Sequence, residues 1–215
     1  MATSGSMVDY YEARASQFEA VYDRPERQAD LHLLRNWLAQ EVRGLTLLEV
    51  ACGSGYWTRV AAATAKAILA TDRNLSPLEL ARSKNLGSHV AFVRADAFAL
   101  PTQACLFEGG MAHFWWSHVS LADQQRFLRH FACKLRSRAK LLMMDNNFAP
   151  GSTPISRRDA LGNTYQRRRL ASGDDYEILK NFPTGAELRR SLEGICASVA
   201  VLQLKHYWAV SALIR

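Results

Sequence analysis

The sequence predicts an α/β fold in which helices cover both faces of a doubly wound, mostly parallel sheet. Short apolar runs alternate with amphipathic helical segments between residues 45 and 145, which is the order that produces parallel strands joined by helices. The chain has 215 residues and is 48% hydrophobic, which suits one compact domain over residues 7–215.

Two helical segments precede the first strand. Four side chains recur at spacings of three and four, namely Tyr11, Ala15, Phe18 and Tyr22. This spacing predicts an amphipathic helix over residues 9–22, interrupted by Pro25. Apolar positions between Leu31 and Val42 predict a second helix, and Gly44 follows it as a C-terminal glycine commonly does. We expect residues 7–44 to form an N-terminal helical lid.

The strands and helices of the main domain follow in order. Five apolar runs predict parallel strands at residues 46–50, 67–71, 90–93, 107–112 and 139–144. Helices are predicted at 57–64, 77–84 and 121–135, and a last one begins at Thr184. Ser120 with Asp123, and Thr184 with Glu187, have the spacing of capping boxes. Residues 199–204 and 207–214 predict two closing strands.

Residues 146–183 interrupt this regular order. They are rich in Gly, Pro, Asn, Ser and Arg, with a weak hairpin pattern at 165–170 and 176–180 and Gly173 in the turn. A long irregular segment in a compact domain is commonly a functional lid or a flexible loop. Because it follows the fifth strand at the edge where α/β sheets bind ligands, we expect this insertion to cover an acceptor site.

Charge and composition limit the function classes. The net charge is +7, and its densest clusters are Arg157-Arg158 and residues 167–169, which either attract an anion or form a solvated basic face. The four cysteines are too scattered for a metal site, so no metal is expected. No apolar run approaches the roughly 20 residues that span a bilayer. We expect a soluble, cytoplasmic protein with no membrane partner.

The strongest motif is a strand that runs into a loop of small residues and then a helix. The loop residues are Ala51, Cys52, Gly53, Ser54 and Gly55. Glycines let the backbone approach a ligand closely. A dinucleotide site would have a third glycine where Thr58 stands, so the pattern argues against pyrophosphate binding.

Acidic residues end the next two strands. Asp72 can accept hydrogen bonds from both ribose hydroxyls of a nucleoside. Asp96 can accept one from an adenine amino group, and Phe98 can pack on the ring. Acids at strand ends also serve as plain turn residues, but three consecutive strand ends together predict a nucleoside site.

These residues resemble the motifs of class I S-adenosylmethionine-dependent methyltransferases: Glu49-x-Ala51-Cys52-Gly53-x-Gly55, Asp72 and Asp96-Ala97. The resemblance covers about residues 10–145 and implies a Rossmann-like, seven-stranded sheet with an antiparallel last strand. It implies S-adenosylmethionine as cofactor, with Glu49 and residues 51–55 at the methionine portion, Asp72 at the ribose, and Asp96 and Ala97 at the adenine. We add Trp57 and Arg73, next to these motifs, to the cofactor-binding candidates. Tyr11 and Arg14 resemble residues of the helix that small-molecule methyltransferases fold over the cofactor carboxylate, although plain aromatic packing also explains them.

The acceptor candidates follow the fourth strand, where the family places the methyl acceptor. The segment from His113 to His118 lacks the Asn/Asp-Pro-Pro-aromatic motif of members that act on adenine or glutamine, which disfavours a nucleic-acid or protein acceptor. His118 is the first candidate base and His113 the second, unless both only cap or pack. The candidates for the acceptor wall and its cover are Trp115, Trp116, Asn146, Asn147, Tyr165, Arg168 and Tyr176. Trp115 and Trp116 are equally compatible with interior packing, and a lid arginine predicts an acidic acceptor.

Methyl transfer to a small molecule is the leading hypothesis for function. Cyclisation of the cofactor itself, with release of methylthioadenosine, would use the same binding motifs. The basic clusters leave RNA methylation as a third possibility, disfavoured because no RNA-binding module is appended. A nonenzymatic cofactor-binding protein is the fourth.

Overall fold

A seven-stranded sheet forms the centre of the computed structural model, which describes residues 6–215. In the order β3-β2-β1-β4-β5-β10-β9, its strands are β1 (Thr46–Glu49), β2 (Ala67–Asp72), β3 (Val90–Arg94), β4 (Phe107–His113), β5 (Leu135–Asn146), β9 (Cys196–Gln203) and β10 (Tyr207–Ile214). Strands β1 to β5 are parallel, and β10 pairs antiparallel with both β5 and β9. The predicted mixed sheet with an antiparallel last strand is therefore confirmed.

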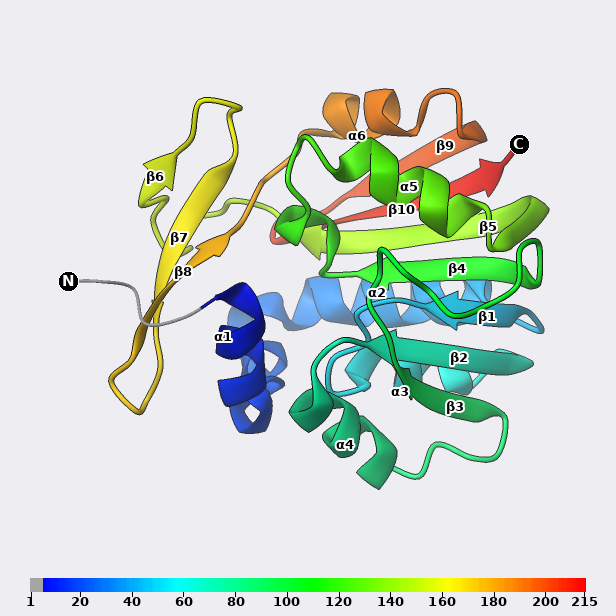
Figure 1. Cartoon of the computed structure of the whole chain (residues 1–215), viewed down its shortest axis with the longest axis horizontal. Helices are drawn as coiled ribbons and strands as arrows, with labels where there is room; N and C mark the ends of the chain where they lie inside the picture. The colour runs from blue at the N-terminus through cyan, green and yellow to red at the C-terminus, as the bar shows by residue number, and fades with distance from the viewer. Residues whose placement is uncertain (1–5) are drawn as a thin grey trace.

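Helices cover both faces of this sheet (Figure 1). One face carries α2 (Gln28–Glu41), α3 (Tyr56–Ala62) and α4 (Leu75–Ser83), and the other carries α5 (Gln124–Ala132) and α6 (Gly185–Leu192). Successive residues of β1 supply the two cores, because Leu47 packs on the α2 side and Leu48 on the α5 side. Within residues 6–215, no helix is both long and apolar enough to cross a membrane.

The N-terminal segment, residues 7–27, is not the single helix that its spacing predicts. Helix α1 (Met7–Ala13) ends early, and short 3₁₀ turns follow at Ala15–Gln17, Ala20–Asp23 and Pro25–Arg27. The turns bring Phe18 against the glycine loop, where a Cβ added to Gly53 would lie 2.8 Å from its ring. A spacing of three to four fits 3₁₀ turns and an α-helix alike, so periodicity could not separate them.

The insertion contains the predicted hairpin and one strand more. Strands β6 (Arg157–Arg158), β7 (Thr164–Arg169) and β8 (Asp175–Leu179) form a separate antiparallel sheet. Gly173 lies in the β7–β8 turn at φ +93°, a conformation that glycine adopts without strain. Tyr10 of α1 packs on Tyr176 of β8 with ring centroids 5.5 Å apart, and Figure 1 shows α1 and this small sheet at the same end of the main sheet.

Several element boundaries differ from the prediction. The capping box of Thr184 and Glu187 is confirmed at the start of α6. Ser120 and Asp123 bond to each other in a turn, and α5 begins only after them. Strand β5 starts at Leu135 rather than at residue 139, with Arg138 at φ +62° and an irregular register against β4.

Candidate active site

The glycine loop connects β1 to α3 in a geometry fixed by its neighbours. The Gly53 amide donates to Asp72 Oδ2 over 2.8 Å, and the Cys52 amide donates to the Thr71 carbonyl over 3.0 Å. At Gly55, an added Cβ would lie 2.9 Å from the Cβ of Ala81 in α4, which side chains do not tolerate. The loop is therefore held tightly against β2 and α4.

Glu49 and Thr58 form a buried pair beneath this loop. The Thr58 hydroxyl donates to Glu49 Oε2 over 2.7 Å. Burial, reinforced by the charge of Asp72, raises the pKa of the Glu49 carboxyl to about 7. Thr58 thus occupies the place of the third dinucleotide glycine with a specific hydrogen bond, which fits a nucleoside site without a pyrophosphate.

The acids at the strand ends lie on adjacent strands. Asp72 Oδ1 accepts from the Asn74 amide over 2.8 Å, and burial raises the pKa of Asp72 despite these backbone donors. Asp96 accepts from the Phe98 amide and pairs with Arg73 at 3.3 Å. Phe98 packs edge-on against Trp115, which lies beside the predicted adenine position. The arrangement suits a nucleoside along the ends of β2 and β3, and the individual cofactor roles stay predictions.

Two carboxylates attach the N-terminal segment to this region. Glu12 accepts from the Ser76 hydroxyl and from the amides of Leu75 and Ser76 at the start of α4, and these bonds lower its pKa. Glu19 accepts from the Ser54 hydroxyl over 2.7 Å and forms an ion pair with Lys84. The segment that carries Tyr11 and Phe18 is thereby anchored to the glycine loop and to α4.

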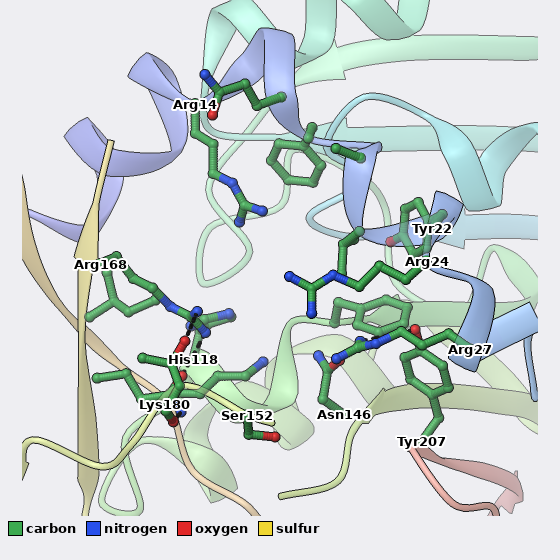
Figure 2. A pocket seen from close by; sticks show the side chains of 18 of the residues that line it. Arg14, Tyr22, Arg24, Arg27, His118, Asn146, Ser152, Arg168, Lys180 and Tyr207 are labelled. Carbon is green, nitrogen blue, oxygen red and sulfur yellow. Dashed lines mark hydrogen bonds between the residues drawn. The ribbon is translucent and has the colours of Figure 1, made fainter. Parts of the chain in front are cut away.

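A cavity of about 440 Å³ lies between the N-terminal segment, the insertion and the ends of β4 and β5 (Figure 2). Six predicted site residues line it, namely Tyr11, Arg14, His118, Asn146, Asn147 and Arg168. Phe18 also lines the cavity and touches the glycine loop. The cavity is therefore adjacent to the predicted position of the cofactor's methionine portion.

Five of the residues predicted as base or acceptor site lie outside this cavity. His113 is still part of β4, where burial lowers its pKa to about 3 and neither ring nitrogen has a hydrogen-bond partner. Trp116 is 1% exposed and packs on Phe127 of α5, while Trp115 turns toward Phe98. The packing of His113 and Trp116 in the interior, and of Trp115 against its edge, disfavours their predicted roles as base and acceptor wall.

The two predicted lid tyrosines also point elsewhere. The Tyr165 hydroxyl donates to Asp159 Oδ2, and its ring lies 3.7 Å from the guanidinium carbon of Arg157. Tyr176 is buried against Tyr10. Residues alternate between the two faces of a hairpin strand, and the sequence does not say which face meets the cavity.

His118 has the hydrogen bonds of a neutral base. Its Nδ1 lies 2.7 Å from the Leu179 carbonyl oxygen, so Nδ1 carries the proton. Its Nε2 is free to accept and lies 2.8 Å from the Tyr11 hydroxyl. Burial and the positive charge of Lys180 keep the pKa of His118 well below its ordinary value. An unprotonated nitrogen therefore lies at the cavity wall.

Sequence reasoning missed a buried ion pair beside His118. Lys180 Nζ lies 2.8 Å from Asp145 Oδ1 and donates to the Ser117 hydroxyl over 2.6 Å. The Ser117 hydroxyl in turn donates to Asp145 Oδ2 over 2.6 Å. Asp145 lies near the end of β5, so the rule that acidic residues at strand ends are candidate ligand contacts, which selected Asp72, could also have found it. Arg24 and Arg27 also line the cavity, but they belong to no recognisable sequence motif.

The reversed last strand, the glycine loop and the successive acidic strand ends define a nucleoside-binding α/β protein. Residues 47–138 match the family model described as a methyltransferase domain. The chain is similar to DhpI solved with SAH, at 24% identity over 95% of this chain and 93% of that one, with a TM-score of 0.78. It is also similar to the DhpI-SAM-HEP complex, at 25% identity over 98% and 99%, with a TM-score of 0.76.

The fold also extends to a protein of different chemistry. The [4+2]-cyclase SpnF is 15% identical over 100% of this chain and 98% of that one, with a TM-score of 0.67. A sequence comparison with curated proteins finds no match. The match to a methyltransferase domain and the structural matches to complexes with SAH and SAM support a class I S-adenosylmethionine-dependent methyltransferase whose cofactor is S-adenosylmethionine.

Proposed function

We propose that the protein transfers a methyl group from S-adenosylmethionine to a small-molecule acceptor bound in the cavity. The observation that carries this proposal is the enclosure of about 440 Å³ beside the glycine loop, covered by both the N-terminal segment and the insertion. Small-molecule sites commonly have this size. A folded protein or a nucleic-acid duplex would not fit beneath two covers.

The chain's own residues have three tasks in this reaction: to align the two reactants, to exclude water and to accept a proton from the acceptor. The bound cofactor supplies a methyl group already activated by its sulfonium, so alignment and exclusion of water matter most. Alignment of two reactants contributes up to about 7–11 kcal/mol, and Tyr11, Phe18 and the insertion enclose the cavity for that purpose. Where the acceptor is a hydroxyl or an amine, His118 Nε2 accepts its proton, with the Tyr11 hydroxyl as its present partner.

The spent cofactor provides the direct test. The protein is incubated with S-adenosylmethionine and a metabolite extract, and both products are identified by mass spectrometry. S-adenosylhomocysteine with a partner molecule heavier by one methylene supports the proposal. Methylthioadenosine would instead demonstrate cyclisation of the cofactor, and neither product across a broad acceptor panel would favour a nonenzymatic binding protein.

The cofactor site is tested separately by calorimetry with S-adenosylhomocysteine. Gly53→Val and Asp72→Ala should abolish binding, because the first places a side chain in the loop and the second removes the ribose acceptor. Gly173→Val is the matched control, since Gly173 also has positive φ but nothing lies within 4 Å of an added Cβ. Wild-type affinity in both site variants would refute the assignment.

The basic clusters give little support to an RNA methyltransferase. Arg157 forms an ion pair with Glu177 at 2.8 Å, and Arg158 donates to the Gly162 carbonyl over 3.0 Å. Both side chains therefore serve the folding of the insertion. RNA retention that weakens steeply with salt would nevertheless reverse this conclusion.

A further inference from the structure

We propose that the acceptor is a small anion whose oxyanion group binds Arg168 of the insertion. The inference rests on the proposed function, because it takes the cavity as the acceptor site. It adds a substrate class, a carboxylate or phosphoryl compound, that the fold itself does not specify.

The charges that line the cavity have one sign. Among residues 6–215, five cationic side chains contribute to it, namely Arg14, Arg24, Arg27, Arg168 and Lys180, and no aspartate or glutamate does. Figure 2 shows the guanidinium groups of Arg14, Arg24 and Arg168 entering the cavity from different sides. A neutral or cationic acceptor would leave the unpaired part of this charge uncompensated.

Two of these cations already have carboxylate partners. Lys180 is paired with Asp145 at 2.8 Å. Arg24 lies 4.0 Å from Glu26 at the surface. These paired cations contribute to the positive electrostatic potential of the cavity, but they need no anionic ligand to balance their charge.

Arg27 and Arg168 are different, because only neutral groups hold them. Arg27 donates to Asn146 Oδ1 and to the Tyr207 hydroxyl, and its Nε is buried without an acceptor. The Nη1 of Arg168 donates to Thr153 Oγ1 over 2.5 Å and its Nη2 to Gln166 Oε1 over 2.6 Å, while its Nε is likewise buried without an acceptor. Across residues 6–215, no carboxylate lies within ion-pair distance of Arg168 or of Arg14. Burial and the charges of Arg14 and Arg24 lower the pKa of the Arg168 guanidinium. Its orientation is fixed, but its charge is not compensated.

The cofactor cannot supply the missing negative charge. S-adenosylmethionine carries one carboxylate, one ammonium and one sulfonium, so its net charge is positive. Its carboxylate satisfies one guanidinium, for which Arg14 is the predicted partner, and its sulfonium adds a further positive charge near the acceptor. An anionic acceptor at Arg168 balances the charge of that guanidinium and the charge of the sulfonium. Its binding should therefore be stronger when the site holds S-adenosylmethionine than when it holds S-adenosylhomocysteine.

Calorimetry on the protein saturated with S-adenosylhomocysteine tests this inference. The titrants are inorganic phosphate and malonate at constant ionic strength, and binding of one but not the other distinguishes a phosphoryl from a carboxylate acceptor. Arg168→Met should weaken binding about tenfold or more, and Arg168→Lys should weaken it less. Arg167→Met, at the exposed neighbouring position of β7, is the matched control and should bind as the wild type does.

Two binding results would overturn the inference: no binding of either anion to the wild type, or an equal loss in Arg167→Met and Arg168→Met. Thermal unfolding without anion verifies that each variant is folded. In Arg168→Met the loss of charge repulsion raises the midpoint and the loss of two hydrogen bonds lowers it, so the two effects oppose each other. Calorimetry measures anion binding without turnover, so it is independent of the product assay. Anion affinity that depends on Arg168, combined with no formation of S-adenosylhomocysteine in the product assay, would contradict the proposed function alone. Full methylation of a neutral acceptor by Arg168→Met would contradict this inference alone.

Discussion

The buried Glu49 carboxyl makes the stability of the protein depend on pH, and Glu49→Gln should remove that dependence. Its pKa is about 7 in the folded protein against an ordinary value of 4.5. The folded state thus binds the proton more tightly than the unfolded state. The free energy of unfolding therefore falls as pH rises from about 4.5 to about 7 and levels off above that. At about 1.4 kcal/mol per pKa unit, the full loss is about 3 kcal/mol.

Glutamine keeps an oxygen that accepts from Thr58 and carries no charge. Urea unfolding at pH 4.5 and pH 8 should accordingly show Glu49→Gln close to wild type at the lower pH and more stable by up to about 3 kcal/mol at the higher pH. Glu193→Gln, at an exposed position, is the control and should track the wild type at both values. A wild type and a Glu49→Gln variant that differ equally at both pH values would refute the reasoning.

The other predictions concern the two sides of the N-terminal segment. His118→Gln should lower kcat by about 10²–10⁴ while leaving S-adenosylhomocysteine affinity intact, because it removes a base and not a cofactor contact; an unchanged kcat would show that the acceptor attacks without one. Glu12→Gln should weaken S-adenosylhomocysteine binding about tenfold in calorimetry, since the charge that holds α1 on α4 is lost. Glu26→Gln, at an exposed position of the same segment, serves as its control, and equal affinities in the two variants would exclude the anchoring role.

The parts of the fold that repeat along the chain were predictable. Apolar runs predicted the parallel strands, and the ends of parallel strands meet at one edge of the sheet. The sequence alone therefore placed Asp72 and Asp96 close together. The same rule could not reveal which way a residue turns just beyond a strand. His113 therefore ranked beside His118, although one is enclosed in β4 and the other lies on the cavity wall.

The cavity itself depends on contacts that no local pattern encodes. Tyr11 and His118 are 107 positions apart, and Asp145 and Lys180 are 35 apart. The sequence can suggest each of these residues separately. The two pairs form only after the N-terminal segment and the insertion have folded over the sheet. Strand β6 has two residues, which is too short for an alternating pattern to be recognised.

The N-terminal segment forms a common wall of two compartments, because Phe18 lies over the glycine loop while Tyr11, seven residues earlier, borders the acceptor cavity. Its anchors at Glu12 and Glu19 are on the cofactor side, and its contacts with Tyr176 and His118 are on the acceptor side. Displacement of this one segment would uncover both compartments at once. In the proposed reaction, exchange of the spent cofactor and release of the product would thereby be coupled.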